Sequence, residues 1–174
     1  FDSATRTFSG TPANDDVGAL AIEVTASDIS GETATTSFTV TVNNSNDAPT
    51  VSNSLPDQIA AEDAPFNFQI AAGAFADVDT GDTLSYSAQL TDGDPLPSWL
   101  NFDVATRTFS GIPADADVGM FEIEVTASDG NGGSAADIFT ITVANTNDAP
   151  MVLNPIANQT LSEGTPLSFQ FDST

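Results

Sequence analysis

Acidic residues that could bind a metal ion recur in short loops of this sequence. Glu62 lies in the segment AAEDAPF, Asp77 and Asp79 lie in FADVDTGD, and Asp129 lies in ASDGNGG. Carboxylate and carbonyl oxygens are the ligands that Ca²⁺ prefers, and the ion takes about six to eight of them in a loose geometry. Two carboxylates spaced as Asp-x-Asp can point at one ion, whereas carboxylates gathered without a cation repel one another. These loops are therefore candidate calcium sites.

A second set of oxygen-bearing residues occurs twice, 101 positions apart. It consists of an acidic loop, NDDVG or DADVG, and a later tail, TVNNSNDAP or TVANTNDAP. Its candidate ligands are Asp16, Asn46 and Asp47 in the first copy and Asp117 (with Asp115), Asn147 and Asp148 in the second. Asp, Asn and Gly are also ordinary turn residues, and an isolated Asp-Gly or Asp-x-Asp commonly only shapes a loop. Both interpretations stay open for any single cluster, and the regular recurrence favours metal binding.

An internal repeat places these loops at fixed positions. Shifting the sequence by 101 positions aligns residues 1–73 with 102–174 without a gap, and about half of the aligned pairs are identical. A period of about 100 residues is the size of an independent sandwich domain. With the NDAP tails as boundaries, we expect the C-terminal half of one repeat at 1–49, a complete repeat at 50–150, and the N-terminal part of the next at 151–174. The chain then represents a window on a longer tandem array.

Apolar residues alternate with polar ones throughout the predicted complete repeat. In MFEIEVTAS, the side chains of Phe121, Ile123 and Val125 point one way, and those of Glu122 and Glu124 point the other. Similar runs are FNFQI, LSYSAQL and IFTITV, and clusters of Gly, Pro, Asp and Asn separate them. No segment has a sustained helical stripe. About seven short strands in about 100 residues predict an all-β, Greek-key β-sandwich.

The composition limits the classes of partner and of chemistry. The chain has 25 Asp plus Glu against two Arg, without Lys or His, and its formal charge is −23. Nucleic acid and anionic membranes are therefore poor partners, and cations are the natural ones. No apolar run is long enough to span a bilayer. Because Cys, His and Lys are absent, Ser–His and Cys–His triads and Schiff bases are excluded. The composition alone does not exclude a glycosidase, which needs only a pair of carboxylates. No feature of the sequence indicates such a site, so we expect no enzyme.

The chain resembles the bacterial cadherin-like repeats of the dystroglycan-type group, which occur in large surface and secreted proteins. The segments FDVATRTFSGIPADADVG, IEVTASDGNGG, FTITVANTNDAP and FADVDTGDTLSYS carry the resemblance. It implies tandem cadherin/immunoglobulin-like sandwiches of about 101 residues, an extracellular or cell-surface location, and Ca²⁺ bound between consecutive repeats. Neighbouring repeats of the same array would then be partners of each repeat.

The resemblance also implies a ligand set for each junction between repeats. The first junction would use Asp16, Asn46 and Asp47 from one side and Asp77, Asp79 and Asp129 from the other. The second would use Glu62, Asp117, Asn147 and Asp148, with its remaining ligands beyond Thr174. The acidic Asp-Arg-Glu motif of the family is replaced here, and Asn44 and Asn145 stand where the family has Asp. We therefore expect fewer or weaker ions per junction than the three typical of the family.

Three functions follow from these observations. The first is a non-catalytic stalk or adhesion module that Ca²⁺ stiffens. The second is a carbohydrate-binding module, in which an exposed Trp99 or Tyr86 would stack on a sugar, although Trp99 is more simply explained as a core residue. The third is self-association of identical chains through sandwich edges or through the incomplete end repeats. We also expect Arg107 to pair with a nearby carboxylate such as Asp103 and so to hold a turn.

Overall fold

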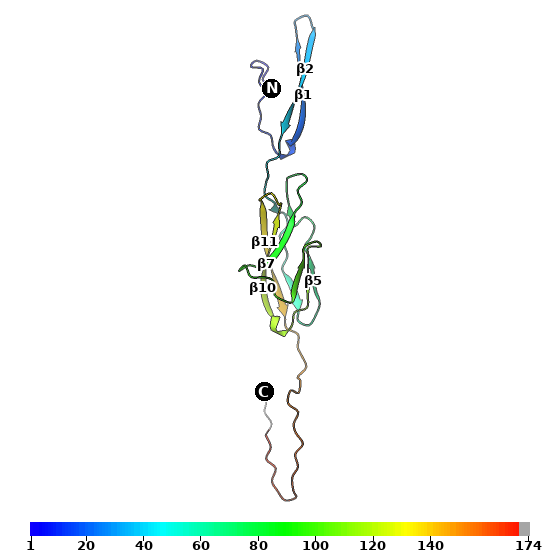
Figure 1. Ribbon diagram of the computed structural model, residues 1–174, viewed down its shortest axis with the longest axis vertical. Coiled ribbons are helices and arrows are strands. Elements are labelled where there is room, and N and C mark those ends of the chain that lie inside the picture. The colour runs from blue at the N-terminus through cyan, green and yellow to red at the C-terminus, as the bar shows by residue number, and fades with distance from the viewer. Residues whose placement is uncertain (171–174) are drawn as a thin grey trace.

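The alternating segments form strands in the computed structural model, which describes residues 1–170 (Figure 1). Residues 1–49, called the first unit, contain β1 (Gly18–Ser27) and β2 (Thr33–Val42). Residues 50–150, called the central unit, contain β3 (Thr50–Val51), β4 (Gln58–Ala61), β5 (Phe66–Gln69), β6 (Phe75–Ala76), β7 (Ser85–Leu90), β8 (Leu100–Asp103), β9 (Thr108–Gly111), β10 (Gly119–Ser128) and β11 (Ser134–Ala144). The helical elements of the described chain are two 3₁₀ turns, Asn14–Asp16 and Asp115–Asp117.

The central unit is a β-sandwich, as predicted. One sheet has the strand order β4-β11-β10-β7 and the other β5-β9-β8, while β3 pairs with β6. The pairs are antiparallel except for β4 and β11, which run parallel. The chain crosses between the two larger sheets after β4, between β7 and β8, and between β9 and β10, as in Greek-key sandwiches. These crossings place several acidic loops at the same end of the sandwich.

The predicted inward residues of the central unit form its core. On β10 and β11, Ile123, Val125 and Ile141 are fully buried, and Phe139 is 1% exposed. From the opposite sheet Phe109 is also fully buried, and its ring centroid lies 5.5 Å from that of Phe139. Burying one large apolar side chain contributes about 1.5–3 kcal/mol. This packing fixes the strand ends from which the acidic loops emerge.

The first unit repeats part of this fold. Its β1–β2 register, from Gly18 opposite Val42 onward, is that of β10–β11 shifted by 101 residues. Its apolar face, however, is open: Phe8 and Phe38 are 47% and 43% exposed, whereas their counterparts in the central unit are buried. A groove of about 730 Å³ lies along this face. The sequence period is thus also a structural period.

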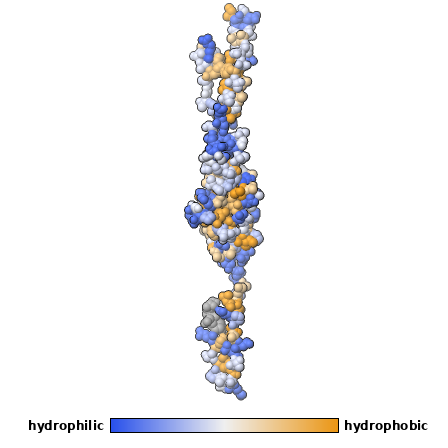
Figure 2. Space-filling model, in the orientation of Figure 1, coloured by the Kyte–Doolittle hydropathy of each residue, from blue (hydrophilic) through white to orange (hydrophobic). Residues whose placement is uncertain are grey.

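The described chain is elongated (Figure 1). The first unit lies at one end, the central unit in the middle, and residues 151–170 at the other end, without a strand and with exposed side chains. Residues 171–174 of the predicted third segment lie outside the described residues. Figure 2 shows hydrophilic residues gathered where the first unit meets the central unit. In the described part of the chain, no helix is long and apolar enough to cross a membrane.

Candidate metal centres at the two ends of the central unit

Carboxylates from separate loops converge at the end of the central unit that faces the first unit. Asp77 and Asp82 lie in the loop after β6, and Asp129 lies directly after β10. Each offers a carboxylate oxygen, and these three oxygens lie within 4.8 Å of one another. Asp79 belongs to the same loop, where its backbone N–H donates to Asp77 Oδ1 at 2.9 Å. We call these four residues the upper cluster.

The linker of the first unit contacts this cluster directly. The backbone N–H of Asp47 donates to Asp79 Oδ2 at 2.7 Å, and Asn46 Nδ2 donates to Asp129 Oδ2 at 3.0 Å. Pro49, which ends the NDAP tail, is buried. The backbone is tightly packed as well, since a Cβ added at Gly133 would lie 2.7 Å from Ala48 Cα. The first junction therefore brings together residues of both units.

The upper cluster contains buried oxygens that lack a donor. Asp79 and Asp129 are 5% and 6% exposed. Asp77 Oδ2 and Asp79 Oδ1 are buried and have no hydrogen-bond partner, although buried polar atoms in proteins are nearly always paired. The pKa of Asp129 is lowered from its usual value, chiefly because the Asn46 amide donates to it and also because backbone N–H groups of its own loop do. These hydrogen bonds thus favour the ionised form of the Asp129 carboxylate.

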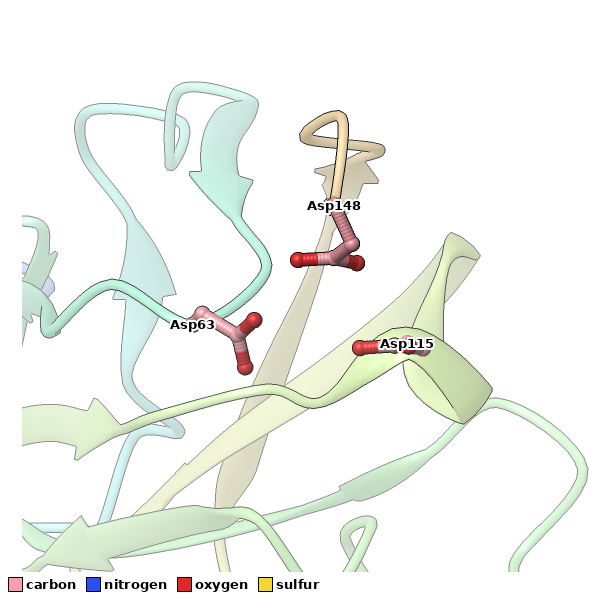
Figure 3. Close-up of side chains that lie close together, drawn as sticks. All are labelled: Asp63, Asp115 and Asp148. Atoms are coloured by element: carbon pink, nitrogen blue, oxygen red, sulfur yellow. The ribbon is translucent and has the colours of Figure 1, made fainter. Parts of the chain in front are cut away.

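A second group lies at the opposite end of the central unit, near the tail at Asp148. Carboxylate oxygens of Asp63, Asp115 and Asp148 lie within 4.8 Å of one another, and all three residues are exposed (Figure 3). Glu62 is 2% exposed; its Oε1 accepts from the backbone N–H of Thr146 at 2.5 Å, and its Oε2 has no partner. We call Glu62 and the three Asp residues the lower cluster.

The structure brings most of the predicted ligands close to these clusters, with two differences. Asp16 and Asp117 lie in the 3₁₀ turns, where each accepts a hydrogen bond at 2.9 Å from a backbone N–H three residues earlier. Their carboxylates cap the turn, and Asp115 instead lies in the lower cluster. Asn147 donates to the carbonyl oxygen of its neighbour Asp148 at 3.3 Å.

Sequence reasoning left out two members of the clusters. Asp82 and Asp63 lie inside the quoted segments FADVDTGD and AAEDAPF but are not among the predicted ligands. The available signal was local: Asp82 is five residues from Asp77 across a Thr-Gly turn, and Asp63 directly follows Glu62. Asp63 adopts a left-handed backbone with a φ of 59°, which sequence alone does not specify for Asp.

The donor atoms of both clusters fit a hard divalent cation. Every candidate side-chain ligand is an oxygen, and the sequence contains neither His nor Cys, which disfavours Zn²⁺. Two buried carboxylates, Asp79 and Glu62, each have an oxygen without a hydrogen-bond partner. Ca²⁺ accepts several such oxygens at variable geometry. The residues present therefore suit Ca²⁺ at each end of the central unit.

The aromatic and basic residues serve the fold. Trp99 is partly buried and packs edge-on against Phe66 and Phe121, as its interpretation as a core residue predicts. The predicted pairing of Arg107 with Asp103 is wrong. Arg107 lies over the Tyr86 ring, 5.7 Å from its centroid.

Asp103 instead shapes the turn that precedes Arg107. Its carboxylate accepts hydrogen bonds from the backbone N–H groups of Thr106 and Ala105. Both bonds lower the pKa of Asp103, and the bond from Thr106 has the larger effect. The turn leaves Arg107 in a left-handed backbone conformation with a φ of 55°. Asp103 Oδ1 accepts both hydrogen bonds and so holds this turn.

Solved structures with this architecture define the class as cadherin-like β-sandwiches. The first two extracellular domains of human mucin-like protocadherin match with a TM-score of 0.62 and 16% identity, over 80% of this chain and 74% of that chain. The protocadherin gamma B2 extracellular cadherin domains match with a TM-score of 0.61 and 20% identity, over 78% of this chain and 28% of that chain. At this level of identity, the likeness establishes the fold.

Sequence comparison identifies the family. The model described as "Putative Ig domain" matches residues 1–43 and 48–144, and the chain belongs to that family. The serine-rich adhesin for platelets of Staphylococcus aureus is 31% identical over 140 residues, which are 80% of this chain and only 6% of that protein. The chain is thus a cadherin-like and Ig-like module similar to adhesins, extracellular or at the cell surface as predicted.

Proposed function

We propose that this chain is a non-catalytic spacer or adhesion module whose repeats are locked into a stiff rod by Ca²⁺ at their junctions. The observation that carries the proposal is the set of buried, unpartnered carboxylate oxygens on Glu62, Asp77 and Asp79. A buried charge without a partner is strongly unfavourable. The chain has 25 acidic residues against two Arg. It therefore has too few positive charges of its own to neutralise these carboxylates, and a bound cation would do so.

The proposed role of each residue follows from its position. Asp77, Asp79, Asp82 and Asp129 would hold the ion at the first junction, and Asp47 would join them from the linker. Bound Ca²⁺ would supply positive charge that neutralises the carboxylates of both units at once. Because the linker backbone already donates to Asp79, the first unit would be fixed relative to the central unit.

The lower cluster would serve the second junction. There Glu62, Asp63, Asp115 and Asp148 provide the oxygens from the side of the central unit, and the repeat that follows would complete the site. Ligands drawn from two repeats turn a hinge into a rigid connection, because bending would pull oxygens off the ion. The proposal includes the division of the chain into repeats that end at residues 49 and 150.

A calcium titration of the complete chain tests the proposal. Thermal unfolding is measured in excess EDTA and in millimolar Ca²⁺, together with the maximum dimension from small-angle scattering. We expect Ca²⁺ to raise the melting temperature and to narrow the distribution of dimensions. The double variant Asp77→Asn, Asp79→Asn should lose most of this response, whereas Asp94→Asn, in an exposed turn, should retain it. Equal curves in EDTA and Ca²⁺ for the wild-type chain would refute the proposal.

A further inference from the structure

The first unit and the central unit differ in the residue that faces their NDAP tails. Asn14 and Asp115 occupy the same position of the 101-residue repeat, each at the start of its 3₁₀ turn. Asn14 Nδ2 donates to Asp47 Oδ2 at 2.8 Å. At the equivalent place Asp115 brings a carboxylate to within 4.8 Å of Asp148 (Figure 3). An amide donor thus faces one tail, and a second negative charge faces the other.

The difference changes what each tail needs in order to stay in place. A side-chain amide satisfies a carboxylate without bringing charge, and a hydrogen bond to an ionised acceptor is stronger than one between neutral groups. Two carboxylates at the distance of Asp115 and Asp148 repel each other, and Asp63 adds a third. The first tail is therefore held by a hydrogen bond within the protein. Repulsion between carboxylates destabilises the second tail in the absence of a cation.

Neighbouring groups strengthen this contrast. In the first junction, the Asn46 amide and the Asp47 N–H also donate to carboxylates, those of Asp129 and Asp79. At the second tail, the Asn147 amide is directed to the Asp148 carbonyl. Glu62, 2% exposed, retains an unpaired oxygen beside this tail, which independently points to a missing cation at this end.

We propose that the residue at this repeat position determines whether an NDAP tail needs a cation to stay in place on its own unit. The Asn14 amide holds the Asp47 carboxylate on its own unit without Ca²⁺, whereas Asp115 makes the position of the second tail depend on a cation. The inference rests on the proposed function, since it assumes that Ca²⁺ is the stiffening ion. An array built in this way would soften first at its Asp-type junctions when the cation concentration falls.

Reciprocal substitutions in the complete chain test the inference. Hydrogen exchange of the peptides that cover residues 44–48 and 145–149 is measured by mass spectrometry in EDTA and in millimolar Ca²⁺. In wild-type protein, we expect the first peptide to be protected in both conditions and the second only with Ca²⁺. Asn14→Asp should speed exchange of the first peptide in EDTA roughly tenfold, the effect of losing one hydrogen bond to a charged group, and Ca²⁺ should restore protection.

Asp115→Asn should have the opposite effect on the second peptide, with slower exchange in EDTA and a smaller response to Ca²⁺. Asp94→Asn serves as the charge-matched control and should leave both peptides unchanged. Unaltered exchange of the first peptide in Asn14→Asp would overturn the inference, even if Ca²⁺ still protects the second. If Asn14→Asp speeds exchange in EDTA but no variant responds to Ca²⁺, the role of the Asn14 amide is supported and the proposed function fails.

Discussion

Replacing Glu62 by Gln should weaken the calcium dependence of stability at the lower end of the central unit. Glu62 Oε1 accepts from Thr146, whereas its buried Oε2 has no partner. Gln keeps the acceptor and removes the unpaired charge, which relieves a penalty of about 1–3 kcal/mol in the absence of cation. Taking the lower figure, the melting temperature in EDTA should rise by about 4–8 °C for a domain of this size.

In Ca²⁺ the same substitution should act against stability. An ion present at 100 times its dissociation constant stabilises the folded state by about 2.7 kcal/mol, and Glu62→Gln removes one of its charged ligands. The gain on adding Ca²⁺ should therefore shrink, so that the variant exceeds wild type in EDTA and loses that advantage in Ca²⁺.

Differential scanning calorimetry in EDTA and in Ca²⁺ measures this smaller gain in stability. Glu163→Gln is the matched control, because Glu163 holds the same repeat position in an exposed segment, and it should change neither curve. A variant that is destabilised equally in EDTA and in Ca²⁺ would refute the reasoning, since Glu62 would then be an ordinary structural residue.

Three further outcomes follow from close contacts and from a turn. Gly111→Ala should lower the free energy of unfolding by about 3 kcal/mol or more, and the urea midpoint with it, because its Cβ would lie 1.8 Å from the Trp99 carbonyl oxygen. Gly133→Ala should leave the core intact but displace the linker at Ala48, which small-angle scattering would detect as altered interunit geometry. The lowered pKa of Asp103 contributes stability above its unfolded pKa of about 3.9 that is lost as the pH falls through the lower folded value, so Asp103→Asn should flatten the acid decline of the urea midpoint.

The fold was predictable because two independent periodicities agree. Alternation with period two identifies the strands, and the inward residues it selects, such as Ile123, Val125 and Ile141, are fully buried. The repeat of 101 residues identifies the unit, and the shared register of β1–β2 and β10–β11 confirms it as a structural period. The pairing of strands distant in sequence, such as parallel β4 and β11, could not be predicted, because local patterns do not specify partners across a sandwich.

The candidate sites were less predictable than the fold. The loops that carry ligands can be identified from clustered Asp, Asn and Gly, but which carboxylate enters the cluster depends on turn geometry. In DADVG the capping bond from Ala114 uses Asp117, and the first Asp of the turn lies beside Asp148 instead. In the separate turn between β4 and β5, the backbone of Asp63 lies in the left-handed region. A difference of one or two residues therefore separates a ligand from a cap, and spacing alone does not resolve it.

The same geometry explains how repeats of the same fold would differ in mechanical properties. The core and the 3₁₀ turn fix the backbone at repeat position 14 or 115, so the side chain there is free to vary without altering the sandwich. On the proposal above, changing one oxygen of that side chain for a nitrogen would replace a cation by an amide as the partner of the tail carboxylate. Because the substitution lies outside the core, its energetic effect is confined to the junction. Stiffness can therefore be adjusted junction by junction while every unit keeps the same fold.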